Sequence, residues 1–143
     1  MKTGNLRAVA LCAAMAIAAC GDDDSFSPTV DNVAGSYTAT TFTVETDLVG
    51  TVDLLAAGAT VSAVLDADGT TTGRLFIPEG DDDGSDLDVD LAGTWTLAGD
   101  TVTFSQTGGS FITDVDFVAS ENRLTGEGTF DDTDVLLVLT KDD

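Results

Sequence analysis

The residues of this chain that could perform chemistry are almost all carboxylates. The 143 residues include 26 Asp and Glu, five Lys and Arg, and no His. The lack of histidine removes the commonest general base and the commonest metal ligand, and no Gly-x-Ser-x-Gly motif is present to activate a serine. Paired carboxylates could hydrolyse a glycosidic bond, but among 26 acids some pairs lie together by chance. We therefore expect no enzymatic activity and no cofactor.

The acidic segment Glu79–Asp90 is the sharpest candidate for a cation site. Its sequence EGDDDGSDLDVD places oxygen-bearing residues at loop positions 1, 3 and 5, and Gly84 at position 6. The calcium loop of an EF-hand begins with Asp, ends with Glu and lies between two helices. Here Glu and Asp are exchanged at these two positions, and no flanking helices are expected. We therefore expect an acidic hairpin loop without a metal; weak Ca²⁺ binding would involve Asp81, Asp83, Asp86 and Asp88.

The N-terminal segment has the pattern of an export signal. Lys2 and Arg7 precede an uninterrupted apolar run, Ala8–Ala19, which has the length of a signal-peptide core and is too short to span a bilayer. The run ends in Ile17-Ala18-Ala19-Cys20 and is followed at once by Gly-Asp-Asp-Asp. This sequence resembles the lipobox of bacterial lipoproteins. An ordinary secretory signal with an incidental cysteine, or a retained membrane helix, is the alternative.

The resemblance to the lipobox implies cleavage before Cys20 and acylation of its thiol. The other cysteine, Cys12, would leave with the signal, so the mature chain has no disulfide and no free thiol. A diacyl group and an N-terminal acyl chain such as palmitate would provide the two or more chains that stable anchoring requires. We expect residues 1–19 to be the signal peptide and 20–33 a flexible acidic tether. The expected location is the bacterial cell envelope, at the outer membrane or cell surface rather than the inner membrane.

Composition and charge limit the classes of partner that the protein can bind and indicate its fold class. All 26 acids follow residue 20, and the formal charge of the whole chain is −21. Nucleic acid would be repelled, and an anionic lipid surface is also unattractive, so the acyl chains must do the anchoring. The chain contains 22 Asp, 22 Thr and 15 Gly, a composition typical of strands joined by turns.

Alternation of apolar and polar residues predicts eight short strands. Only one link is long, Glu45–Gly58, which could hold a helical turn capped by Thr51 or Asp53. Eight sequential strands predict an all-β fold, an antiparallel eight-strand up-and-down β-barrel spanning residues 34–143; a β-sandwich is the alternative. The expected strands are Tyr37–Val44, Ala59–Asp66, Thr71–Ile77, Leu87–Leu97, Thr101–Gln106, Phe111–Ala119, Arg123–Phe130 and Asp134–Lys141.

Inside such a barrel, Gly126 and Gly128 would face inward and permit close approach of other side chains. Over Ala34–Lys141 the chain resembles the lipocalin-like domains of bacterial lipoproteins. The resemblance rests on the eight-strand rhythm, on Gly35-Ser36-Tyr37 at the first strand, on the LDADGTTTG hairpin and on the GTWTL motif at Gly93–Leu97.

Two hypotheses about function follow. The barrel could carry or sense a small lipophilic ligand, or it could have a filled core and act as a structural or surface-displayed interaction module, because eight strands allow either interior. The membrane, reached through the lipid anchor, is the expected partner, and the sequence indicates no protein partner. In the first case, the inward residues that would line the ligand site are Tyr37, Leu75, Ile77, Trp95, Phe104 and Phe117.

Overall fold

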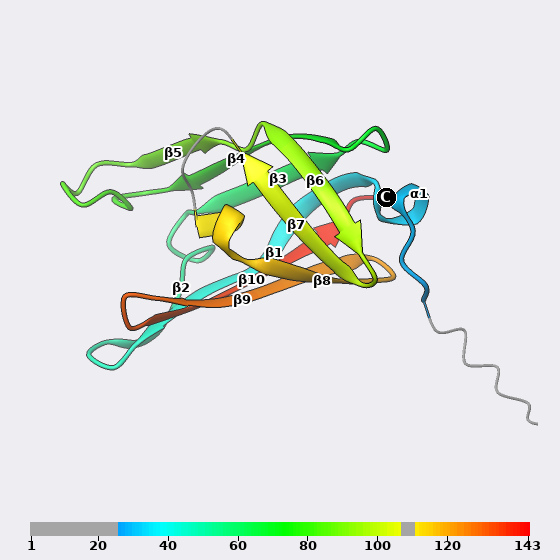
Figure 1. Ribbon diagram of the computed structural model, residues 1–143. Coiled ribbons are helices and arrows are strands. Elements are labelled where there is room, and N and C mark those ends of the chain that lie inside the picture. The colour runs from blue at the N-terminus through cyan, green and yellow to red at the C-terminus, as the bar shows by residue number, and fades with distance from the viewer. Residues whose placement is uncertain (1–25, 107–110) are drawn as a thin grey trace, which may run out of the picture.

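The computed structural model describes residues 26–106 and 111–143, and strands dominate them (Figure 1). A short α-helix, α1 (Val30–Val33), and a 3₁₀ helix, η1 (Phe111–Asp114), are the helical elements of this part of the chain. The strands are β1 (Gly35–Thr46), β2 (Gly50–Asp53), β3 (Thr60–Leu65), β4 (Thr70–Ile77), β5 (Leu87–Asp90), β6 (Gly93–Ala98), β7 (Thr101–Gln106), β8 (Asp116–Ser120), β9 (Arg123–Phe130) and β10 (Thr133–Lys141).

Eight of these strands close into an antiparallel barrel. Their order is β1, β3, β4, β6, β7, β8, β9 and β10, and β10 pairs back onto β1 from Tyr37↔Lys141 to Thr46↔Thr133. The two remaining strands extend the wall: β2 pairs with the second half of β1, and β5 pairs with the second half of β4. The predicted all-β barrel is therefore confirmed, and the closing pair of strands rules out the sandwich.

The strand expected at Leu87–Leu97 is interrupted. Both halves keep one register along β4, since Arg74 lies opposite Asp90 and Thr70 lies opposite Thr94. Between the halves Leu91 is buried, and its N–H donates to the Gly73 carbonyl over 3.0 Å. The break has a physical reason: β6 turns away from β4 to pair with β7 along its whole length. The prediction was right about the alternating faces and wrong about continuity.

The strand expected at Phe111–Ala119 is shorter. Residues Phe111–Asp114 form η1, and β8 begins only at Asp116. Ile112 and Val115 are both buried, a spacing of three residues that suits a helical turn and not alternation along a strand. The alternation that predicted a strand is real only from Val115 onward.

The long link Glu45–Gly58 begins as a hairpin, because β2 pairs with Thr43–Thr46 of β1. A single turn follows, in which the Asp53 carboxylate accepts the Ala56 N–H over 3.1 Å and Gly58 has a φ of 103°. Asp53 therefore caps this turn as expected, and Thr51 lies in the strand instead.

One end of the barrel is covered by the segment that precedes β1. Thr29 and Asn32 form a reciprocal capping box around α1, and Val33 is buried in the core. The Tyr37 hydroxyl donates to the Val33 carbonyl over 2.6 Å, and Lys141 Nζ donates to the Asn32 carbonyl over 2.9 Å. The last residues of the expected tether 20–33 are thus packed on the barrel, so the folded part begins before the expected boundary at residue 34.

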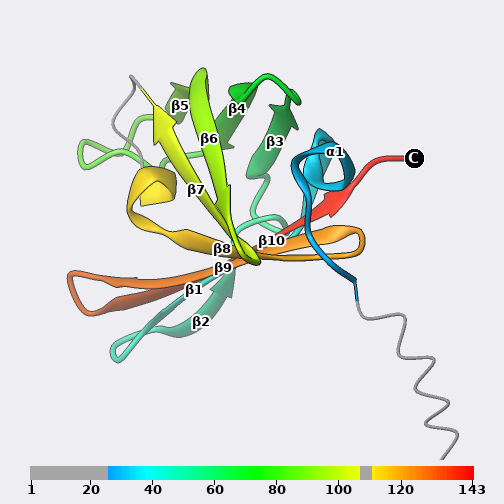
Figure 2. The same ribbon diagram turned by 45° about the vertical axis from the view of Figure 1, so that its right-hand side comes forward.

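We call this the closed end of the barrel. It also carries the C-terminus, whereas the β1–β2 hairpin, the β9–β10 hairpin and the β4–β5 loop lie at the opposite end (Figures 1 and 2). Within residues 26–106 and 111–143, no helix has the length and hydropathy needed to cross a membrane.

The core follows the alternation of apolar residues within the strands. Val102, Phe104, Val115, Phe117, Leu137 and Leu139 are all buried. The two inward glycines do permit close packing: a Cβ at position 126 would lie 2.6 Å from a Phe117 ring carbon, and one at position 128 would lie 2.9 Å from a Phe130 ring carbon. Bulky rings therefore occupy the space that the two glycines leave free.

Candidate functional site

Five of the six residues predicted to line a ligand site are buried in the hydrophobic core. Each of them is at most 4% exposed: Tyr37, Leu75, Trp95, Phe104 and Phe117. Phe104 and Phe117 meet edge to face with ring centres 5.3 Å apart. The Trp95 indole N–H donates to the Asp66 carbonyl over 2.8 Å, which satisfies its polar atom. These five side chains are therefore enclosed by their neighbours, whereas the sixth residue, Ile77, is only half-buried.

Ile77 lines a cleft of about 520 Å³ at the end of the barrel opposite α1, which we call the open-end cleft. Eight of the lining side chains are apolar, and most of them are half-buried and not sealed in the core. The full lining consists of Phe42, Val44, Leu54, Ile77, Gly80, Asp82, Leu87, Phe111, Phe130, Asp131, Thr133 and Val135.

The cleft exists because neighbouring strands separate at this end. β3 pairs only with Gly35–Thr38 of β1, while β2 takes over the same edge at Thr43–Thr46. Likewise, β6 pairs with the first two residues of β4, and β5 takes over from Arg74 to Ile77. The β1–β2 and β4–β5 hairpins therefore carry the wall away from the barrel axis. The inward residues at the ends of these two hairpins surround a hollow.

Three phenylalanines form a continuous aromatic wall in the cleft. The Phe42 and Phe111 rings are stacked with centres 5.7 Å apart and planes 28° apart. Phe130 meets Phe111 at 6.1 Å with an angle of 63° between the planes. The 3₁₀ turn η1 places the Phe111 ring between the ring of Phe42 on β1 and that of Phe130 on β9. The wall is therefore complete only because this segment is a helical turn and not the predicted strand.

The polar residues of the cleft are acidic or neutral. Asp82 comes from the β4–β5 loop and Asp131 from the β9–β10 turn, where Asp131 and Asp132 have φ of 46° and 61°. None of the twelve lining residues is basic. The described bases lie elsewhere: Arg74 pairs with Asp88 on the outer face, and Lys141 donates to Asn32 at the closed end. Arg123 is the first residue of β9, opposite Ser120 of β8 and Thr140 of β10. The cleft thus combines an apolar interior with negative charge at its opening.

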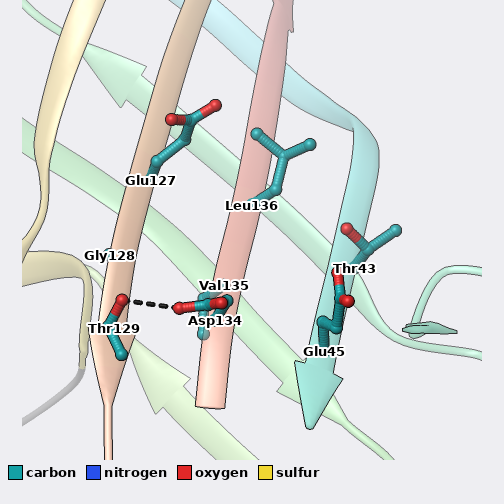
Figure 3. A pocket seen from close by; sticks show the side chains of 8 residues that line it. All are labelled: Thr43, Glu45, Glu127, Gly128, Thr129, Asp134, Val135 and Leu136. Atoms are coloured by element: carbon teal, nitrogen blue, oxygen red, sulfur yellow. Dashed lines mark hydrogen bonds between the residues drawn. The ribbon is translucent and has the colours of Figure 1, made fainter. Parts of the chain in front are cut away.

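A second hollow, of about 480 Å³, lies on the outer face of β1, β10 and β9 (Figure 3). Glu45, Glu127 and Asp134 line it, and Thr129 donates a 2.6 Å hydrogen bond to Asp134. Glu45 is directly opposite Asp134 in the strand pairing, so two like charges face each other. This hollow is therefore an acidic surface patch.

The acidic loop forms local hydrogen bonds. Asp83 accepts from the Ser85 side chain and backbone, which lowers the pKa of its carboxyl. Asp86 accepts the Glu79 N–H over 3.1 Å, and the Asp81 carbonyl accepts the Gly84 N–H. Asp88 lies on the outer face of β5, where its hydrogen bonds with Arg74 lower its pKa and raise that of the guanidinium.

The four candidate calcium ligands are therefore not gathered around a point. Within residues 26–106 and 111–143, no three Asp, Glu or Cys side chains are grouped so that they could hold a metal ion. The other predicted site residue, Cys20, lies outside the described residues, and its acylation stays a prediction.

Sequence reasoning missed seven of the eight apolar residues of the cleft, because alternation shows which side chains face inward but not where strands separate. The available signal was weak: alternation along β10 places Val135 on the same face as Leu137 and Leu139. Alternation from Tyr37 points Phe42 to the opposite face, and Phe42 reaches the interior only because a β-bulge lies between Ala39 and Thr41. Comparison with family models, with curated proteins and with solved structures finds no match for this chain.

Proposed function

We propose that this protein is a non-catalytic binding protein of the bacterial envelope that takes up a small lipophilic ligand in the open-end cleft. The observation that supports this proposal is the cleft itself: about 520 Å³, with eight apolar side chains and an aromatic wall. Ligand sites typically have volumes of about 300–1,000 Å³ and a mostly apolar lining with a few polar groups. Covering the half-buried apolar surface at this end of the barrel with a ligand removes it from water, which is favourable for binding.

The placement of the chain ends fits an anchored binding protein. The described chain starts at Phe26, which packs against the core, and reaches β1 through α1 at the closed end. In the proposal, lipid on Cys20 holds this end near the membrane, and the open-end cleft then faces away from it. Replacement Cys20→Ser should abolish acyl labelling and release the protein from membranes; a variant that stays in the membrane fraction would refute the anchor.

A structural or interaction module with a filled core is the second candidate. The observation in its favour is the burial of Trp95 and Phe117 in the core, which leaves these residues almost no surface for a ligand. In that case the open-end cleft is only the place where the strands of the barrel separate, and it binds no specific compound.

Native mass spectrometry of the protein purified from its own cells separates the two candidates. We expect a non-covalent adduct on the wild-type protein that is lost in Leu87→Trp, because the indole would fill the cleft from β5. Val118→Trp is the matched control, since Val118 is a half-exposed residue of β8 that does not line the cleft. An adduct that persists in Leu87→Trp, or the absence of any adduct, would favour the filled-core module.

A further inference from the structure

We infer that the open-end cleft selects amphiphiles with a cationic head, such as alkylamines or alkyl quaternary ammonium compounds, over neutral and anionic ones. This inference rests on the proposed function, because it specifies the ligand of the same cleft. It is carried by two features found in one place: an aromatic wall and carboxylates at the opening.

The aromatic wall is the first feature. The faces of aromatic rings attract a cation placed within about 6 Å of the ring centre, and several rings together recognise quaternary ammonium groups. Phe111 and Phe130 form such a pair with ring centres 6.1 Å apart, and the buried Phe42 supports it from behind by stacking on Phe111 at 5.7 Å. Phe111 and Phe130 are half-buried, so part of their ring surface remains accessible from the cleft.

The carboxylates are the second feature. Asp82 and Asp131 line the cleft from two different connections, one between β4 and β5 and the other between β9 and β10. No described basic side chain lies in the cleft to pair with them. A cationic head at the opening would therefore find two free carboxylates, while its hydrocarbon chain covers Val44, Leu54 and Ile77.

The same charges act against the opposite class of ligand. A fatty acid in this cleft would bring a carboxylate to the exposed Asp82 and Asp131 without a base to pair with it, and like charges placed together repel each other. The charge of −21 on the chain adds a repulsion that reaches beyond the cleft.

Three probes of equal chain length test this selectivity on the purified protein: octyltrimethylammonium, 1-octanol and octanoate. Isothermal titration calorimetry gives the dissociation constants at low and high NaCl concentration. We expect the cation to bind about tenfold more tightly than the alcohol at low salt, as a cation–aromatic contact with partial carboxylate pairing allows, and this advantage to shrink as salt screens the charges. Methyl NMR should show shifts of Ile77, which lines the cleft.

A pair of double variants separates the cleft from the acidic surface in general. Asp82→Asn/Asp131→Asn should remove most of the preference for the cation and leave octanol binding unchanged. Asp100→Asn/Glu121→Gln removes the same charge from turns at the closed end and should keep the preference. Equal loss in both double variants would mean non-specific attraction to an acidic protein and would overturn the inference.

The neutral probe makes the two proposals distinguishable. If octanol binds and octyltrimethylammonium has no advantage over it, or octanoate binds as tightly as the cation, the selectivity is refuted and the lipophilic cleft stands. If none of the three probes binds, the proposed function fails together with the inference.

Discussion

The inward glycine of β9 offers a quantitative test of the core. In Gly126→Ala the new methyl group would lie 2.6 Å from a Phe117 ring carbon and 2.7 Å from a Val115 methyl carbon. Both neighbours are completely buried, so neither can move aside without displacing others. Overpacking of this kind costs about 1–3 kcal/mol, and the smaller conformational entropy of unfolded alanine returns about 0.4–1 kcal/mol. We therefore expect a net loss of about 1–2 kcal/mol in the free energy of unfolding.

The matched control is Gly128→Ala, two residues further along the same strand. There the nearest atom, at 2.9 Å, belongs to Phe130, whose half-buried ring can move into the open-end cleft, while a methyl carbon of the buried Val115 lies further away, at 3.2 Å. We expect a smaller loss than in Gly126→Ala, at most about 1 kcal/mol, because only the looser contact involves a neighbour that cannot move aside. Urea denaturation of both variants, followed by the fluorescence of Trp95, measures the two values. Equal effects in the two variants, or a stabilised Gly126→Ala, would refute our account of the packing.

Three further predictions follow from single contacts. Trp95 should emit at short wavelength and resist acrylamide, and Trp95→Ala should cost about 3–5 kcal/mol in urea denaturation; free quenching would contradict its burial. Burial raises the pKa of Tyr37 to about 12, so absorbance titration of this single tyrosine should be shifted upward. Because the unfolded chain ionises first, the free energy of unfolding should fall by about 2 kcal/mol as pH rises from 10 to 12. Glu45→Lys should stabilise the barrel by about 0.2–1 kcal/mol in thermal denaturation by facing Asp134, with Glu121→Lys as the control for net charge.

Periodicity predicted the barrel because each strand carries its own pattern. The alternation in β10 places Leu137 and Leu139 inward regardless of what the rest of the chain does, and both are buried. The same is true of Phe117 in β8 and Phe104 in β7. A closed barrel then follows from eight such strands joined by short connections.

The site could not be predicted in the same way, because it depends on where the strands end and separate. Ile77 and Leu75 follow one alternation on β4, yet Leu75 is sealed in the core and Ile77 lines the cleft. Both residues lie opposite β5, Leu75 at Val89 and Ile77 at Leu87, so strand pairing does not separate them. They differ because Ile77 is the last residue of β4, where the wall of the barrel ends. The position of Phe111 could not be predicted either. The apolar residues in FITDV are compatible with both a strand and a 3₁₀ turn, and the structure has the turn.

The pairing of β1 with β10 has a consequence for how the chain folds. Thr40 and Thr140 share a hydrogen bond across a separation of 100 residues, so the seam joins the beginning of the domain to its end. Contacts between residues so far apart in the sequence form slowly, because the intervening chain must lose the entropy of loop closure before the two strands can pair. Until β10 has been synthesised, β1 and β9 each expose an unpaired edge, the kind of surface that promotes aggregation. Ribosome-bound chains that end before residue 133 should therefore be protease-sensitive, and protection should appear late and in a single step.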